Sequence, residues 1–211
     1  MAITRRIDPR AVGVVAAGFL AGALAYPSLP GPFLQVRPLA RVLVAFTLPV
    51  TALAVYLLFR SLWTHDRIRS GNGAFESTYH AIVLQVLLFI VALHALVMVE
   101  LTGAVDALGI QVSGGRVVIV LLGVVLVAIG NLLPRTRPNV AVGVRTARTL
   151  ANARLWQQVH RAGGYATVAL GVFVAVTGLV LTHEAVAPVI SAGALAAATA
   201  VFVTYLKHAR T

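Results

Sequence analysis

The chain has 211 residues, of which 59% are hydrophobic and 11% are charged, and its formal net charge is +11. Its mean hydropathy of +0.92 means that it has too little polar surface for a water-soluble globular protein, which indicates an integral membrane protein. The absence of cysteine excludes disulfides, thiolate metal sites and a cysteine nucleophile. Most of such a chain cannot face water, so we expect no direct nucleic-acid partner despite the positive charge.

Six apolar runs are long enough to span a membrane, since crossing about 30 Å of hydrocarbon takes roughly 20 residues. The runs are continuous, whereas the strands of a membrane barrel would alternate apolar and polar residues, so helices are expected. The predicted spans are residues 11–29, 39–62, 79–101, 117–133, 163–182 and 185–206. The predicted fold is an all-α integral membrane protein, a single membrane domain over residues 1–211. It is a six-transmembrane-helix bundle with a short amphipathic cytoplasmic helix between helices 4 and 5.

Lys and Arg gather on one side of this predicted topology. Fourteen of the 17 lie at the N-terminus, between spans two and three, between spans four and five, or at the C-terminus. The other side holds only Arg37, Arg41 and Arg116. Because cytoplasmic loops carry the excess of Lys and Arg, we expect a multi-pass membrane protein with both termini in the cytoplasm.

Small residues recur at helical spacing in two of the spans. Gly18 and Gly22 form a GxxxG pair in the first span. In the fifth span one stripe is formed by Gly171, Ala175, Gly178 and Thr182. Such stripes let helix backbones approach closely in lipid. We expect them to serve packing within the chain rather than a homodimer interface.

The segment after the fourth span, residues 134–162, is called the motif loop below. It carries six arginines and no Asp or Glu. Pro134 and Pro138 should end the fourth helix, because proline lacks an N–H and fixes its own φ. Asn131 and Asn139 flank this exit, where their side chains can satisfy freed backbone groups.

From about Leu150 to Arg161 the pattern is that of an interfacial amphipathic helix. Its apolar face is formed by Leu155, Trp156 and Val159. We interpret Trp156 as a headgroup anchor, with His160 four residues later on the same face. Gly163 and Gly164 would then permit a turn into the fifth span.

The arginines of the motif loop have two interpretations. They can be topology determinants attracted to anionic lipid. They can also form a docking site for an acidic partner or a phosphate-bearing ligand, since arginine binds carboxylate and phosphate bidentately. Attraction to lipid requires no Pro, Asn, Gly or Trp at particular places, so the pattern of the loop favours docking.

The segment GNLLPRTRPNVAVGVRTARTL, followed by a Trp and by HRAGG, resembles the signature of the SdpI family of bacterial multi-pass membrane immunity proteins. The resemblance covers about residues 130–164, and the six-span layout agrees with it. The matching positions are Asn131, Pro134, Arg137, Asn139, Gly143, Arg145, Thr146, Thr149, Leu150, Trp156, His160 and Gly163.

The resemblance implies a membrane immunity or signal-receptor protein of the bacterial inner membrane that protects against an antimicrobial peptide toxin. It also implies that the matching positions of the motif loop form a binding site. The partners it suggests are a peptide toxin at the outer face and a cytoplasmic repressor that is held at the membrane, beside the membrane lipids that the composition and charge already lead us to expect.

Ionisable residues within spans are functional candidates, because burying them in lipid is costly. His94 lies in the third span and Glu100 near its outer end, while His183 and Glu184 lie where the fifth span emerges. If these spans are adjacent, the four side chains could bind a divalent metal. The alternative, which we favour, is that His94 bonds a backbone carbonyl or Thr177 while the other three are hydrated. We therefore expect no cofactor.

Catalytic motifs are absent from the sequence. There is no Walker motif and no G-x-S-x-G, and THEAV lacks the second His of HExxH. One alternative function is a membrane enzyme that acts on a lipid, with His160 as base and Arg145 as phosphate clamp. Another is a transporter of a small ligand, which should show inverted repeats or broken charged helices. We predict that the protein is not an enzyme.

Overall fold

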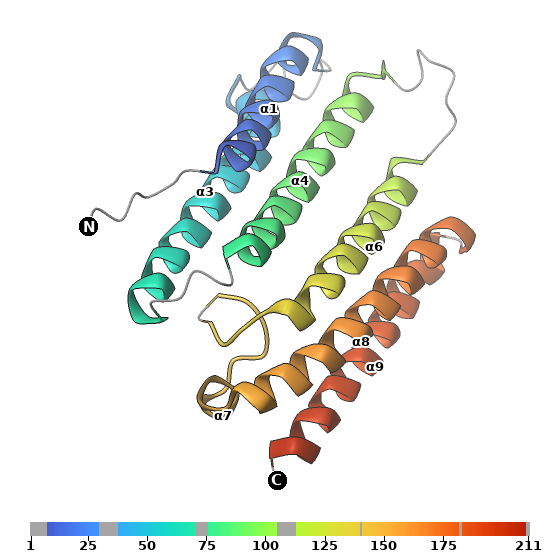
Figure 1. Ribbon diagram of the computed structural model, residues 1–211. Helices are drawn as coiled ribbons and strands as arrows, with labels where there is room; N and C mark the ends of the chain where they lie inside the picture. Colours follow the sequence, from blue (N-terminus) through green and yellow to red (C-terminus); the bar gives the residue numbers. More distant parts are fainter. Residues whose placement is uncertain are drawn as a thin grey trace. The chain divides into compact units, whose positions relative to one another are not determined.

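The computed structural model describes residues 8–29, 38–70, 76–104, 113–139, 141–181 and 183–209, and every regular element within these ranges is a helix (Figure 1). In chain order the elements are α1 (Pro9–Ala25), the 3₁₀ turn η1 (Tyr26–Ser28), α3 (Pro38–Ser70), α4 (Glu76–Leu101), α6 (Gly114–Leu132), the 3₁₀ turn η3 (Leu133–Arg135), α7 (Ala147–Ala151), α8 (Ala153–Val180) and α9 (His183–Ala209).

Six helical segments in the described part are long and apolar enough to cross a membrane. They are Pro9–Ser28, Leu39–Thr64, Ser77–Leu101, Gly114–Arg135, Ala153–Val180 and Ala185–Ala209. Each overlaps one of the predicted spans, so the all-α, six-span fold class is confirmed. Leu24, Val180 and Leu195 are at least 70% exposed. Lipid tails accommodate such apolar surface, whereas water would not.

The chain packs as two compact units, the first formed by Met1–Ser61 and Val86–Gly115. In this unit the GxxxG pair brings α1 close to its neighbours. A Cβ at Gly22 would overlap the carbonyl oxygen of Ala45 in α3 and lie 3.2 Å from Nε2 of His94 in α4. A Cβ at Gly18 would lie 3.1 Å from the side chain of Val91. The packing within the chain that the pair predicted is therefore observed.

The second unit is formed by Leu62–Gln85 and Arg116–Thr211, and in it α6 and α8 meet along glycines. We call Gly123, Gly130, Gly164, Gly171 and Gly178 the glycine seam. A Cβ at Gly171 would lie 2.6 Å from the carbonyl oxygen of Gly123, and one at Gly164 would lie 2.7 Å from that of Gly130. The glycines recur every seven residues on each helix, so one face of each helix touches the other along two turns or more.

The amphipathic stretch from Leu150 to Arg161 does not form a separate helix that turns at Gly163 and Gly164. Instead α8 runs unbroken from Ala153 to Val180, and the separate short helix before it is α7. Gly164 packs closely against Pro134: a Cβ at this position would lie 2.8 Å from the proline ring, so a larger residue would not fit. An unbroken helix also keeps its backbone hydrogen bonds where water is scarce.

Candidate functional site

The motif loop leaves α6 through η3, close to the glycine seam. Thr136 ends this turn: its backbone N–H donates to the carbonyl oxygen of Leu133 at 3.0 Å, and its hydroxyl donates to the same oxygen at 2.7 Å. The ring of Pro134 lies against Gly164 of α8. The start of the loop is thus held at the point where α6 and α8 touch.

The indole of Trp156, in the first turns of α8, is completely buried. Its Nε1 donates to the carbonyl oxygen of Thr136 at 3.0 Å and to the hydroxyl oxygen of Thr136 at 3.3 Å. The interpretation of Trp156 as a headgroup anchor is therefore wrong. The indole N–H, which an anchor would offer to water or to a headgroup, has its acceptor inside the protein.

The imidazole of His160 stacks on Trp156, with ring centroids 3.9 Å apart and an angle of 14° between the planes. Its Nδ1 lies 2.8 Å from the carbonyl oxygen of Trp156, and its Nε2 accepts from the backbone N–H of Val144 at 3.0 Å. A carbonyl can only accept, so Nδ1 carries the hydrogen and Nε2 the lone pair. This geometry fits the neutral ring, because a protonated Nε2 would face another N–H.

Gly143 is needed at its position for two reasons. Its φ is +105°, in the left-handed region that side chains disfavour. A Cβ at this position would also overlap Nε2 of His160. The imidazole cannot move aside freely, because Trp156 and Val144 hold both of its nitrogens.

Asn139 holds the middle of the motif loop and is only 2% exposed. Its Nδ2 donates to the carbonyl oxygens of Arg137 at 2.7 Å and Val142 at 3.3 Å. Its Oδ1 accepts from the backbone N–H groups of Ala141 at 2.9 Å and Val142 at 2.7 Å. The expectation that this side chain satisfies freed backbone groups is confirmed.

The irregular part of the motif loop ends at α7, where Thr146 and Thr149 form a capping box. The backbone N–H of Thr149 donates to Oγ1 of Thr146 at 3.1 Å, and the N–H of Thr146 donates to Oγ1 of Thr149 at 2.9 Å. The Thr149 hydroxyl is buried and donates to the carbonyl oxygen of Val144 at 2.8 Å. The same stretch of backbone is therefore fixed by Thr149 and by His160.

These buried polar and aromatic side chains are called the buried scaffold below: Thr136, Asn139, Thr149, Trp156 and His160. The arginines of the motif loop behave in the opposite way. All of them are exposed, namely Arg135, Arg137, Arg145, Arg148, Arg154 and Arg161. The buried scaffold fixes the backbone while the guanidinium groups stay available at the surface.

A polar hollow lies where α8 passes the exit of α6. It has a volume of about 230 Å³ and is lined by Pro134, Arg154, Gln157, Gln158 and Arg161. The four polar residues lie at spacings of three, four and seven on one side of α8. Two guanidinium groups and two amides supply the kind of donors that bind carboxylate or phosphate oxygens. We call this hollow the arginine hollow.

The structure brings most of the predicted motif positions into one folded loop, but two positions differ. Asn131 is exposed in the last turn of α6. A Cβ at Gly163 would touch only Val201, at 4.0 Å. Of the two adjacent glycines, it is Gly164 that packs against another backbone.

The predicted metal residues do not form a cluster among the residues that the structure describes. His94 is completely buried. Neither of its ring nitrogens makes a hydrogen bond of ordinary geometry, although the backbone carbonyl of Gly18 is the nearby acceptor. Glu100 is exposed and accepts from the backbone N–H of Gly114 at 3.3 Å. The side chains of His183 and Glu184 lie outside the described residues, so the four-residue site stays a prediction.

Two residues that build the site, Asn152 and Thr136, were not among the predicted site residues. Asn152 caps α8, since its Oδ1 accepts from the N–H groups of Arg154 and Leu155, each at 3.0 Å. An Asn directly before a helical pattern is a recognisable N-cap signal. Thr136 carried no such signal, because its partner Trp156 lies 20 residues further along the chain.

Comparison with known proteins bears on the same part of the chain. Residues 135–206 match the model of the SdpI/YfhL protein family. The comparisons with curated proteins and with solved structures gave no match. The matched segment holds almost the whole motif loop and continues through α8 into α9. The family that this multi-pass membrane protein matches over residues 135–206 is the one that its motif resembles.

Proposed function

We propose that the protein is an SdpI-like membrane immunity or signal-receptor protein. It protects the cell against an antimicrobial peptide toxin, and its motif loop docks an acidic cytoplasmic partner such as a repressor. The family match of residues 135–206 supports the immunity role. The positive-inside rule supports a cytoplasmic position for the loop.

The observation that carries the docking role is that the motif loop combines a buried scaffold with exposed arginines. Five buried side chains hold the backbone, and six exposed arginines project from it with no Asp or Glu in the segment. A loop that served only as a topology signal would need positive charge but no scaffold. A fixed backbone lowers the entropy cost of binding, because the arginines start from a limited set of positions.

Within the loop, the arginine hollow is the place that fits an acidic side chain best. Arg154 and Arg161 can each form two parallel hydrogen bonds with a carboxylate. Gln157 and Gln158 add amide donors beside them. The hollow would thereby recognise a carboxylate by geometry as well as by charge.

His160 is poorly placed for the alternative role of a catalytic base. A base needs a free lone pair within reach of a substrate proton. Here the lone pair on Nε2 accepts from Val144, and Nδ1–H is directed at the carbonyl oxygen of Trp156. The imidazole is also 2% exposed, so a substrate would have to displace the loop to reach it.

The immunity role is tested by deleting the protein and measuring the survival of the cells in their own spent culture medium. We expect the deletion strain to be killed and the wild-type protein to restore survival. Equal survival of the deletion strain and its parent, in medium shown to contain a secreted peptide toxin, would reject the immunity role.

The docking role is tested with the double variant Arg154→Gln and Arg161→Gln. Neutral amides keep the polar surface but lose the charge-assisted bonds, so we expect protection to fall at least tenfold. Arg116→Gln is the control, because it removes an exposed arginine outside the motif loop. Membrane abundance should be equal in all three proteins. If the double variant protects as well as the control, the arginine hollow is not the docking site.

A further inference from the structure

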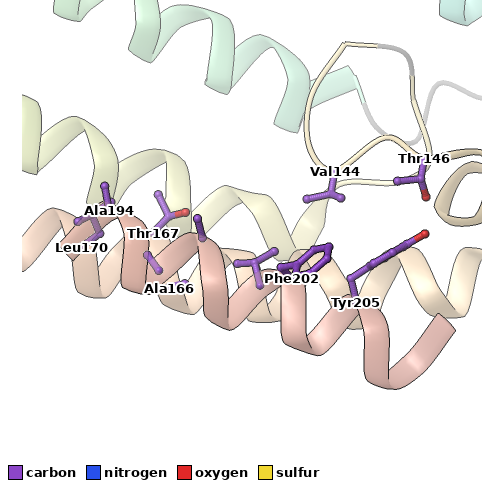
Figure 2. A pocket seen from close by; sticks show the side chains of 11 residues that line it. Val144, Thr146, Ala166, Thr167, Leu170, Ala194, Phe202 and Tyr205 are labelled. Atoms are coloured by element: carbon purple, nitrogen blue, oxygen red, sulfur yellow. The ribbon is translucent and has the colours of Figure 1, made fainter. Parts of the chain in front are cut away.

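A second, apolar recess lies between α8 and α9. Its volume is about 530 Å³, and Figure 2 shows the side chains that line it. They include Ala166 and Leu170 of α8, Ala194, Ala198 and Tyr205 of α9, and Thr146 of the motif loop. We call this recess the α8–α9 groove.

The lining of the groove indicates an occupant that is apolar along most of its length and polar at one end. Thr167, which lies near Leu170 and Ala194 in Figure 2, donates its hydroxyl to the carbonyl oxygen of Gly163 at 2.7 Å and so presents no free donor. The hydroxyl groups of Thr146 and Tyr205 lie together at one end of the row, and Leu170 and Ala194 lie at the other (Figure 2). A Tyr at that end is typical of the membrane interface.

The length of the groove corresponds to one leaflet of a bilayer. From Ala194 to Tyr205 the helix rises about 16 Å at 1.5 Å per residue. Half of a hydrocarbon core of about 30 Å is about 15 Å. A groove that runs from the middle of the membrane to one interface fits the acyl chain of a lipid in that leaflet.

The polar end of the groove carries positive charge. Arg148 donates from Nη1 to the carbonyl oxygen of Ala209 at 3.4 Å, so its guanidinium reaches the last turn of α9, just beyond Tyr205. Lys207 is exposed in the same turn. Between residue 134 and the C-terminus the only acidic residue is Glu184, at the opposite end of α9. The complement of this charge is an anionic headgroup.

We infer that the α8–α9 groove is a binding site for one anionic phospholipid. An acyl chain lies along the alanines of α9, and the phosphate lies at Arg148 and Lys207. The ligand differs from a toxin or a repressor, and the residues differ from those of the arginine hollow. The inference therefore stands or falls separately from the proposed function.

The test is native mass spectrometry of the purified full-length protein with added dioleoyl-phosphatidylglycerol or dioleoyl-phosphatidylcholine. Because a basic residue near anionic lipid contributes roughly a fivefold preference, we expect at least that ratio in favour of phosphatidylglycerol. Arg148→Gln should lower the ratio about fivefold, whereas Arg137→Gln, which also removes an exposed arginine of the loop, should leave it unchanged.

The groove itself is tested by filling it. Ala198→Phe should abolish retention of the bound lipid. The control is Ala196→Phe, which should still retain the lipid because Ala196 is exposed on α9 and does not line the groove. Arg148→Gln preserves the packing of the groove, so the headgroup result holds even if Ala198→Phe fails to fold. Equal binding of the two lipids by the wild type, retention of lipid by a folded Ala198→Phe, or a bound peptide in place of lipid would each overturn the inference.

Discussion

At the scale of single residues, the motif loop depends on buried polar groups whose hydrogen bonds are satisfied locally. Asn139 uses both ends of its amide, and His160 uses both ring nitrogens. Leaving one such partner unsatisfied in a buried place costs about 1–3 kcal/mol. Substitutions in the scaffold should therefore act mainly on stability, and substitutions of the exposed arginines mainly on binding.

Gly143→Ala should destabilise the protein. The left-handed backbone alone costs of order 1–3 kcal/mol for a residue with a Cβ, and the overlap with His160 adds to it. The unfolding midpoint of the purified protein in mild detergent measures the effect. Gly103→Ala is the matched control, because its φ is +70° but its Cβ would meet nothing within 4 Å. If the two variants lose the same stability, the contact between Gly143 and His160 does not matter.

At the scale of elements, α6 and α8 hold the irregular part of the motif loop in place. Backbone contacts along the glycine seam bring the end of α6 against Gly164, and the loop then crosses to Trp156 and His160 on the first turns of α8. Helices in lipid lack a hydrophobic driving force for association, so close van der Waals packing carries this interface. Movement of α8 relative to α6 would pull directly on the loop.

Gly171→Ala should weaken the contact between α6 and α8. The added Cβ would lie 2.6 Å from the carbonyl oxygen of Gly123 and 2.7 Å from the backbone nitrogen of Val127, so the helices must separate. Overpacking of this kind typically costs about 1–3 kcal/mol. Unfolding in sodium dodecyl sulfate measures the loss. Gly163→Ala, also in α8, has space for its Cβ and should be neutral or slightly stabilising. Equal losses would argue against the glycine seam.

At the scale of the whole molecule, the distribution of charge determines how the six spans enter the membrane. Fourteen of the 17 Lys and Arg lie on one side of the expected topology, including all six arginines of the motif loop. Loops with many Lys and Arg stay in the cytoplasm during insertion. The docking role requires this orientation, because the expected repressor is a cytoplasmic protein.

The orientation can be measured by labelling engineered cysteines, since the natural chain has none. Ser113→Cys, before α6, should react with a membrane-impermeant maleimide added to intact cells. Ala151→Cys, in the motif loop, should react only after the membrane is permeabilised. Both positions are exposed, so accessibility within the protein does not distinguish them. The reverse pattern of labelling would show that the motif loop faces outward.

Some parts of the site could be predicted because their causes are local. The exit after Pro134 and the Asx-type bonds of Asn139 depend on residues within a few positions. The roles of Trp156 and Gly164 could not be predicted. A Trp in a basic amphipathic stretch is usually an anchor, and paired glycines commonly mark a turn. Here the carbonyl of Thr136 and the backbone of Gly130 override both preferences.

The sequence by itself determined the membrane class, the six helical spans and the family motif. The membrane class and the spans depend on the length of each apolar segment and on hydrogen bonds within each helix, so no contact with a distant residue is needed to predict them. Only the tertiary structure decided that α8 continues through Gly163 and Gly164 and that His160 is a neutral, buried support. The hydrogen bonds responsible join distant residues: Val144 and His160 are 16 positions apart, and Thr136 and Trp156 are 20 positions apart. They exist because the glycine seam holds the end of α6 beside the start of α8.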